Sequence, residues 1–303
     1  MRYMFIEQHR DRWEVSMMCR LLQVSRSGYY AWRTRPVSQR EMANQELLAA
    51  IEKAFAASDG TYGSPRIYEE VKNQVACSIH RVARLMRQHG IRAKQPRRYK
   101  GTTKQKDGRQ AAPNHLQQTF TATQPAEKWC GDITYIWTAA GWLYRAVIID
   151  LFSRRIVGWA MDRRMTAALV SDAFRMAWRQ TRPEAGLLFH SDRGSQYTSQ
   201  PYQQLLAAHK VQVSMSGTGN CYDNAVVESF FGTLKMERVH HAHYQTREEA
   251  KTDIFFYIES FYNRRRRHSS LGYLSPLAYE ASYHEQAAAI DHCLSPLNYG
   301  NLR

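Results

Sequence analysis

The stretch from Trp129 to Arg238 constrains the fold most, because strand and helix patterns alternate along it in a definite order. Apolar runs rich in β-branched and aromatic residues predict strands, and apolar residues at helical spacing predict helices. The resulting order, β-β-β-α-β-α-β-α, predicts a mixed five-stranded α/β sheet whose first three strands form an antiparallel meander. The expected strands are residues 133–137, 142–149, 155–161, 187–190 and 211–215; the expected helices are residues 166–180, residues 201–209 and one that Asp223 or Asn224 caps.

Three acidic residues fall on three different elements of this order. Asp132 lies in the first strand, Asp192 just past the end of the fourth, and Glu228 in the first two turns of the last helix. Fifty-nine residues separate the two aspartates, and thirty-five separate Asp192 from Glu228. Clustered carboxylates repel each other unless cations lie between them. Carboxylate oxygens favour Mg²⁺ or Mn²⁺, and two such ions can clamp the attacking and leaving oxygens of an in-line phosphoryl displacement.

The sequence motifs around these acids resemble those of one protein family. The chain contains, in order, G-D-I-T-Y-I, D-L-F-S-R-R-I-V-G-W, H-S-D-R-G-S-Q-Y, D-N-A-V-V-E-S-F-F-G-T-L-K and Y-N-R-R-R-R-H-S-S-L-G-Y-L-S-P. Together with the D-x(59)-D-x(35)-E spacing, these motifs resemble those of the catalytic OrfB-type subunits of bacterial insertion sequences. Such subunits are DDE transposases of the retroviral-integrase type. The resemblance covers essentially the whole chain, with no departure at the three acids.

The resemblance implies an RNase H-like, integrase-type core that binds element ends and catalyses metal-dependent strand cleavage and strand transfer. Asp132, Asp192 and Glu228 would be the catalytic residues and would hold two Mg²⁺ or Mn²⁺ ions per active site. The implied partner is double-stranded DNA, both element ends and target. Synapsis of two ends implies a homo-oligomer, a dimer or larger. The resemblance also implies pairing with, or fusion to, an upstream OrfA-type helix-turn-helix protein.

Positive charge is concentrated in the first third of the chain. The net charge is +15 overall, of which residues 1–112 carry +12 and residues 113–303 carry +3. Such a bias points to a polyanion, and nucleic acid is the usual one; the alternative is a basic surface with no such partner. No apolar stretch is long enough for a membrane span, and the N-terminus lacks a signal peptide. We therefore expect a cytoplasmic, nucleoid-associated protein without membrane contact.

Two helical pairs precede the core and resemble helix-turn-helix units. Residues 15–32 have the spacing of a first pair, in which Ser25 caps a second helix that carries Arg26. The alternative there is a helical hairpin with no DNA contact. A helix is also expected at residues 43–57.

The second pair comprises residues 66–72, which begin with Arg66, and a helix that Ser78 caps. That helix has an apolar face with Ile79, Val82, Ala83 and Met86, and a basic face with Arg81 and Arg84. A basic outer face suits a recognition helix on DNA, although a merely solvated charged face is the commoner outcome.

Other basic residues are expected to contact DNA. Residues 92–110 hold eight Lys or Arg, including Arg97 and Arg98, against one acid. This composition predicts a mobile strap ordered only on nucleic acid, with binding that weakens steeply as salt rises. Lys235 lies two helical turns after Glu228, and the resemblance implies that it holds the DNA end. The alternative is a lysine that faces solvent. The candidates near the C-terminus are Arg264, Arg267 and His268.

Other residues with chemical potential have simpler interpretations. A hairpin that turns at Ala139–Gly141 pairs Asp132 near Val147, which places Asp150 about 10 Å further along the sheet. We therefore expect Asp150 to cap the strand end or to bind the Ser153-Arg154 turn; the alternative is a direct role in the chemistry. His190 either reaches the site or packs in the core.

The expected domains are an N-terminal helical region (1–57), a second helix-turn-helix-like region (58–91), a basic linker (92–117), the catalytic core with its C-terminal helix and basic motif (118–283) and a tail (284–303). Two alternative functions remain open from the sequence. One is a DNA-binding regulator with an inert core, and the other is an RNase H-like nuclease acting on RNA–DNA hybrids. The nuclease does not explain the two helix-turn-helix candidates.

Overall fold

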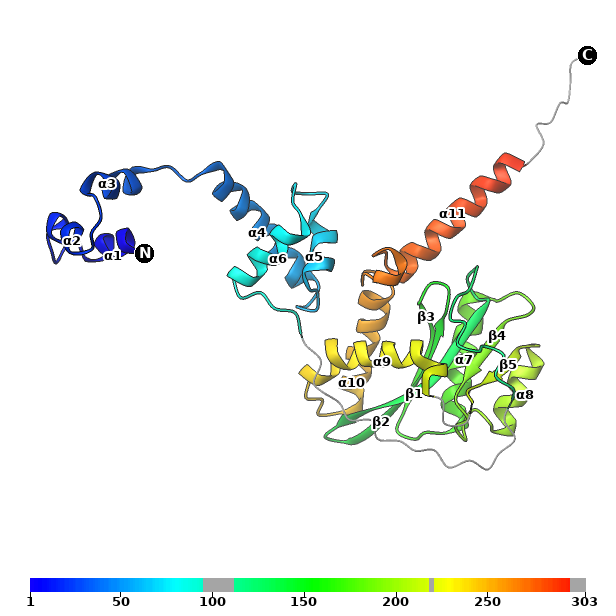
Figure 1. Cartoon of the computed structure of the whole chain (residues 1–303). Helices are drawn as coiled ribbons and strands as arrows, with labels where there is room; N and C mark the ends of the chain where they lie inside the picture. Colours follow the sequence, from blue (N-terminus) through cyan, green and yellow to red (C-terminus); the bar gives the residue numbers. More distant parts are fainter. Residues whose placement is uncertain (95–111, 218–220, 295–303) are drawn as a thin grey trace, which may run out of the picture. The chain divides into compact units, whose positions relative to one another are not determined.

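The computed structural model describes residues 1–94, 112–217 and 221–294, and Arg97 and Arg98 of the expected linker lie outside them (Figure 1). The chain forms two compact units. One combines Met1–Ala57 with Ile67–Arg92, and the other combines Ser58–Arg66 with Ala93–Arg303. The division is therefore interleaved along the sequence. Among the helices that the structure describes, none has the length and apolar content that crossing a membrane requires.

The first unit begins with three short helices, α1 (Arg2–His9), α2 (Val15–Leu21) and α3 (Arg26–Thr34). Their shared core is small and consists of Ile6, Met18, Cys19 and Tyr29. The Ser25 hydroxyl accepts a hydrogen bond from the Gly28 amide, which confirms the predicted cap of α3. Sequence periodicity did not predict α1.

The second helical group comprises α4 (Gln39–Ala57), α5 (Ser64–Val71) and α6 (Ile79–Gln88). Ser78 accepts a hydrogen bond from the Arg81 amide, so its predicted capping role is also confirmed. Val82, Leu85 and Met86 are the buried residues of α6. Ile79 was expected on this apolar face but is exposed, because it occupies the first turn of the helix and lies beyond the buried stripe.

A five-stranded sheet forms the centre of the second unit, in the order β3-β2-β1-β4-β5. The first three strands are antiparallel, which confirms the predicted meander, and β4 and β5 continue the sheet parallel to β1, which makes it a mixed sheet as predicted. Asp132 pairs with Val147 in the expected register. The strands are β1 (Lys128–Thr138), β2 (Gly141–Asp150), β3 (Ile156–Asp162), β4 (Leu188–Ser191) and β5 (Gln212–Met215).

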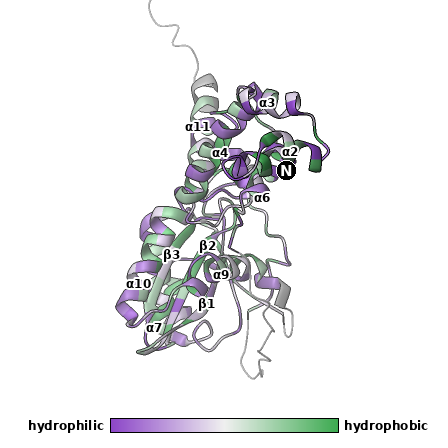
Figure 2. Ribbon diagram, turned by 90° about the vertical axis from the view of Figure 1, so that its left-hand side faces the viewer, coloured by the Kyte–Doolittle hydropathy of each residue, from purple (hydrophilic) through white to green (hydrophobic). Residues whose placement is uncertain are grey.

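Each face of the sheet packs against its own helices. Trp129, Ala146 and Ile148 pack with α7 (Ala167–Thr181) and α8 (Gln200–Ala208). Cys130, Val147 and Ile149 alternate with them and pack on the other face with α9 (Ala225–Glu237), α10 (Arg247–Phe256) and the π-helix η3 (Tyr257–Tyr262). In Figure 2, β2 and β3 carry mainly hydrophobic residues, whereas the surrounding helices mix both kinds. The remaining elements are η1 (Cys221–Asn224), η2 (Val239–His241), η4 (Ser269–Leu271) and α11 (Pro276–Leu294).

Candidate active site

Asp132 lies where β1 continues beyond its parallel neighbour. The pairing between β1 and β4 ends at Gly131, so Asp132 is the first residue of β1 beyond that ladder. Its half-buried carboxylate accepts a hydrogen bond of 2.7 Å from the Ile133 amide. A Cβ atom on Gly131 would lie 2.7 Å from the Phe189 ring. Glycine at this position therefore lets β1 and β4 approach closely beside the acid.

Asp192 follows the last residue of β4 and opens a tight loop. Its Oδ1 atom accepts a hydrogen bond of 2.9 Å from the Gly194 amide. A Cβ atom on Gly194 would lie 2.9 Å from the same oxygen. The glycine therefore allows the loop to fold closely around the carboxylate at the C-terminal edge of β4.

Glu228 lies in the first turn of α9 and is exposed. The start of α9 is attached to β1, because the Asn224 amide Nδ2 donates a hydrogen bond of 3.3 Å to the Gly131 carbonyl. Asn224 occupies the N-cap position of α9, as predicted, but its side chain makes no capping hydrogen bond. The Asp223 carboxylate accepts hydrogen bonds from Asn114, Gln118 and the Gly217 amide and is therefore engaged away from the helix end.

The electrostatic environment of Asp132 includes the other two acids. Burial raises the pKa of Asp132 to about 8, and the negative charges of Asp192 and Glu228 add to this rise. Lys235 acts in the opposite direction on the same pKa. Partial desolvation also raises the pKa of Glu228. Residues far apart in the sequence thus form one region with an excess of negative charge, with Lys235 as its neighbouring cation.

Lys235 lies beside this region, as its spacing from Glu228 predicted. Its Nζ atom is 5.2 Å from the centre of the Tyr135 ring, close enough for a cation–π interaction. Partial burial lowers the pKa of Lys235, whereas the charge of Asp132 raises it. No described acid forms a salt bridge with Lys235, so the ammonium group is available to an external anion.

The donor chemistry of the three acids fits a hard divalent cation, because each contributes carboxylate oxygens. The raised pKa of Asp132 points the same way, since a bound cation would favour its ionised form. In the described ranges of the chain, however, no three His, Cys, Asp or Glu side chains converge closely enough to hold an ion together. Glu228 is exposed on α9, whereas Asp132 and Asp192 lie where the pairing of β1 with β4 ends.

Two neighbouring polar residues have structural roles. Asp150 is buried and accepts hydrogen bonds of 2.9 Å from the amide and the hydroxyl of Ser153, which confirms the predicted turn contact. His190 is buried between the hydroxyl groups of Ser214 and Ser216, at 2.8 and 3.2 Å. Burial lowers the pKa of His190 to about 4, so the ring is neutral and joins β4 to β5.

The C-terminal basic run is only partly directed outward. Arg266 is buried and binds the buried Glu237 through Nη2 at 2.7 Å. The His268 ring packs edge-to-face on Tyr262, and burial beside Arg266 lowers its pKa to about 3. His268 is therefore a neutral side chain held by neighbours rather than a free cation for DNA. Arg264 is exposed, whereas Arg267 donates a hydrogen bond of 3.1 Å to the Tyr273 carbonyl.

The other arginines expected on DNA lie elsewhere. Arg66 is half-buried, donates a hydrogen bond of 2.9 Å to the Arg267 carbonyl and lies over the Tyr62 ring. The remaining three belong to the first unit. Arg26 is exposed over Tyr30, Arg81 binds Asn44, and the buried Nε atom of Arg84 has no partner among the described residues.

Sequence reasoning missed Tyr197, a buried phenol beside two of the acids. Burial raises its pKa well above the usual value, and the charges of Asp132 and Asp192 contribute to the rise. The hydroxyl therefore stays protonated next to the carboxylates. Its position at the end of the motif H-S-D-R-G-S-Q-Y could have identified Tyr197 as a site residue, but sequence spacing alone does not show that the ring turns back toward β1.

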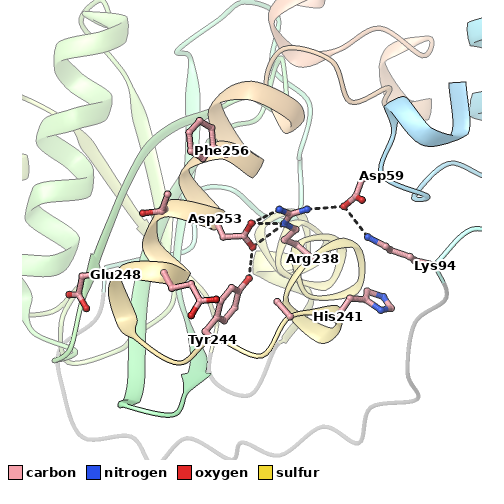
Figure 3. A pocket seen from close by; sticks show the side chains of 11 residues that line it. Asp59, Lys94, Arg238, His241, Tyr244, Glu248, Asp253 and Phe256 are labelled. Atoms are coloured by element: carbon pink, nitrogen blue, oxygen red, sulfur yellow. Dashed lines mark hydrogen bonds and ion pairs between the residues drawn. The ribbon is translucent and has the colours of Figure 1, made fainter. Parts of the chain in front are cut away.

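The last turn of α9 is fixed by an ionic cluster that lines a cavity of about 760 Å³ (Figure 3). Arg238 donates hydrogen bonds to both carboxylate oxygens of Asp253. It also forms an ion pair of 2.8 Å with Asp59. Tyr244 also donates to Asp253, and Lys94 binds Asp59 at 3.0 Å. These charges satisfy each other, so the cavity is lined by a structural network that holds the helix of Glu228 at its opposite end.

Comparison with known proteins is consistent with this geometry. Residues 122–221 and 228–283 match the Integrase core domain family, and residues 42–99 match the HTH-like domain family. Transposase InsF for insertion sequence IS3A of Escherichia coli (strain K12) is 45% identical over 285 residues, which cover 92% of this chain and 98% of the relative. The uncharacterized 31 kDa protein of insertion element IS600 from Shigella sonnei is 44% identical over 272 residues, covering 89% of this chain and all of the relative.

Among solved structures, the HTLV-2 integrase catalytic core domain in complex with magnesium matches with a TM-score of 0.41 and 16% identity, covering 52% of this chain and 98% of that one. The identity to InsF across nearly the full length of both chains establishes the family. The chain therefore belongs to the insertion-sequence transposases with an integrase-type DDE core.

Proposed function

We propose that Asp132, Asp192 and Glu228 carry out the cleavage and joining of DNA strands in this transposase. The observation that carries the proposal is their proximity where β1 runs beyond β4: burial raises the pKa of Asp132, and the charges of Asp192 and Glu228 raise it further. We propose that these carboxylates hold two divalent cations, and the oxygen ligands favour Mg²⁺ or Mn²⁺. The cations would activate the attacking oxygen and stabilise charge on the phosphate oxygens.

The protein's own residues have distinct roles in this proposal. Gly131 and Gly194 let the backbone place the two aspartates close to the sheet edge. Asn224 attaches the start of α9 to β1 and so limits where Glu228 can lie. Lys235 binds a phosphate of the DNA end next to the carboxylates, because it is a cation without an acidic partner.

The domain arrangement extends the proposal. The two N-terminal helical groups, residues 1–57 and 58–91, would bind the element ends, with Arg26, Arg81 and Arg84 as candidate contacts and Arg97 and Arg98 of the linker 92–117 as further ones. The core at 118–283 would act on DNA, and residues 284–303 would form a tail. Joining two ends to a target calls for at least a dimer. Such a substrate would place the protein on the nucleoid in the cytoplasm, alone or with an upstream helix-turn-helix protein.

The test is a cleavage assay on labelled DNA that carries the element's own ends, with Mg²⁺, Mn²⁺ or EDTA. We expect metal-dependent nicking and joining by the wild-type protein. Asp132→Asn should still bind the DNA and should cut at least about 100-fold more slowly, since a metal ligand supplies several kcal/mol of transition-state stabilisation. Cleavage by Asp132→Asn at the wild-type rate would overturn the assignment.

A DNA-binding regulator is the second candidate. The closeness of three acids argues against it, because a protein that only binds DNA gains nothing from carboxylates that repel the phosphate backbone. Binding without cleavage in any metal, both by this chain and by its fusion to the upstream protein, would favour the regulator.

A further inference from the structure

The tip of the β1–β2 hairpin presents three exposed aromatic rings on one face. Tyr135, Trp137 and Trp142 have 43%, 59% and 43% of their surface exposed. Trp142 contacts both of the others edge-to-face, with ring centres 5.1 Å from Tyr135 and 4.8 Å from Trp137. We refer to these three residues as the aromatic platform.

The register of the hairpin explains why the rings share a face. Trp137 pairs directly with Trp142, so their side chains project from the same side of the ribbon, and Tyr135 lies two residues before Trp137. On the opposite face, Ile136 and Leu143 are buried in the core. The exposure of the platform is therefore confined to one side of a well-packed hairpin.

The platform is next to the candidate active site. Lys235 lies over Tyr135, and the same lysine influences the pKa of Asp132. Tyr135 and Trp137 follow Asp132 by three and five residues, roughly 10 and 17 Å along an extended strand. Because side chains alternate along a strand, both rings project from the face of β1 opposite to Asp132, so a DNA strand that reaches both the acid and the rings must cross the edge of β1. In the described chain β4 pairs with β1 only as far as Gly131, so no strand covers this edge.

Positive charge flanks the platform on both sides. Lys235 lies beside Tyr135, and the Nε atom of Arg247 donates a hydrogen bond of 3.0 Å to the Trp142 carbonyl. Gly141 has a φ angle of +102°, and a Cβ atom there would lie 2.8 Å from the Arg247 guanidinium, so glycine permits this contact. Neither cation forms a salt bridge with an acid in the ranges that the structure describes. Exposed aromatic rings flanked by free cations are the pattern that binds unpaired nucleic-acid bases and their phosphates.

We propose that Tyr135, Trp137 and Trp142 stack on unpaired bases of the DNA end, about three to five nucleotides from the phosphodiester that is cut. Separation of the terminal base pairs would let the strand pass over the open edge of β1, with its phosphates on Lys235 and Arg247 and its bases on the rings. This inference rests on the proposed role of Asp132 and its partners as the site of cleavage.

A binding experiment tests the stacking without requiring catalysis. Ends that carry 5-iodouracil at single positions are bound to Asp132→Asn in EDTA and irradiated, and the cross-linked peptides are identified. We expect cross-links to residues 135–142 from positions about three to five nucleotides from the cut. Cross-links that fall only elsewhere on the protein would overturn the proposal, whatever the cleavage assay shows.

A cleavage experiment tests the consequence. Trp142→Ala should slow cutting of fully paired ends by about 5- to 150-fold, the loss expected for one base-stacking contact. The loss should shrink on ends whose terminal pairs are mismatched, because less unpairing is then required, and Trp142→Phe should recover most of the rate. Phe255→Ala is the matched control, since Phe255 is also 43% exposed. Equal rates for Trp142→Ala and the wild type on paired ends would refute the platform while leaving the catalytic assignment intact.

Sedimentation tests the alternative that a second copy of the chain covers this face. If the platform joins two copies of the chain, Trp142→Ala should reduce the oligomer in the absence of DNA. That result together with unchanged cross-linking yields would contradict the proposal, whereas an unchanged oligomer with lost cross-links supports it.

Discussion

The two ends of α9 carry glutamates with opposite environments. Glu228, in the first turn, is exposed and makes no hydrogen bond or ion pair with another described residue. Glu237, in the last turn, is buried, is bound bidentately by Arg266 and accepts a hydrogen bond of 2.7 Å from Tyr257. Eight residues thus separate a charge with no described hydrogen-bond or ion-pair partner from one whose partners are built into the fold. The comparison shows that two acids on one helix can differ in whether the fold already supplies their partners, and it is the acid without built-in partners to which we assign a catalytic role.

The largest effect should come from Glu228. Replacing it by Gln removes a negative charge that no described side chain neutralises, so the fold should lose nothing. We expect strand cleavage to fall at least about 100-fold, because a metal-binding charge is lost. Single-turnover cleavage of labelled ends measures the loss of activity, and urea unfolding of the same protein measures its stability. A Glu228→Gln protein that is markedly unstable would contradict the contrast within α9.

Glu237 should show the reverse. Glu237→Gln leaves the buried Arg266 guanidinium without its counter-charge, and breaking a buried pair in this way costs about 3–5 kcal/mol of unfolding free energy. The double variant Glu237→Leu with Arg266→Met should recover much of that loss, because it removes both charges together. Chemical denaturation of the three proteins measures this. A single variant that loses less than about 1 kcal/mol would show that the pair contributes as little as a surface salt bridge.

Arg145 extends the comparison, since it is a buried arginine that forms no salt bridge with a described acid. It lies inside β2 over the Phe230 ring, and its three guanidinium nitrogens have no hydrogen-bond partner among the described residues. Burial lowers its pKa to about 9. We expect Arg145→Leu to stabilise the protein by about 1–3 kcal/mol, as relief of an unpaired buried polar group does. The matched control is Arg155→Leu, which removes an arginine that is paired with Glu280 and should be destabilising.

His268 gives the smallest effect and a pH dependence. Its pKa falls to about 3 in the folded protein, below the ordinary value near 6.5. The unfolded chain therefore binds a proton that the folded chain does not between these values, so stability is complete above about pH 6.5 and declines as the pH falls. The decline should not exceed about 1.4 kcal/mol per pH unit. The unfolding free energy, measured in urea at pH 7.5, 6 and 5, should depend less on pH in His268→Gln than in the wild type. An unchanged pH dependence in the variant would show that other groups cause the decline.

Much of the fold could be predicted because its determinants are local. The turn at Ala139–Gly141 fixed the register that pairs Asp132 with Val147, and the strands and helices of the core followed from periodicity. Ser25 and Ser78 were recognisable caps because their partners lie three residues away. The π-helix at Tyr257–Tyr262 has no comparable local pattern and was expected as ordinary helix.

The parts of the site that escaped prediction depend on contacts distant in the sequence. Asp223 resembles a helix cap, but Asn114 and Gln118, more than a hundred residues earlier, engage its carboxylate. His268 was expected to contact DNA, because its neighbours Tyr262 and Arg266 surround it only after folding. Tyr197 was overlooked for the same reason. Sequence spacing identified the three acids, but it could not tell which surrounding charges are already satisfied.

The most direct test measures cleavage rate and unfolding free energy on the same preparations of the wild type, Glu228→Gln and Glu237→Gln. The account predicts opposite losses. Glu228→Gln keeps the wild-type stability and loses cleavage, whereas Glu237→Gln loses stability and, under conditions where it is folded, retains cleavage within a few fold. If Glu228→Gln cuts its DNA ends at the wild-type rate, or if both variants lose stability and activity in parallel, the assignment of Glu228 to catalysis is contradicted.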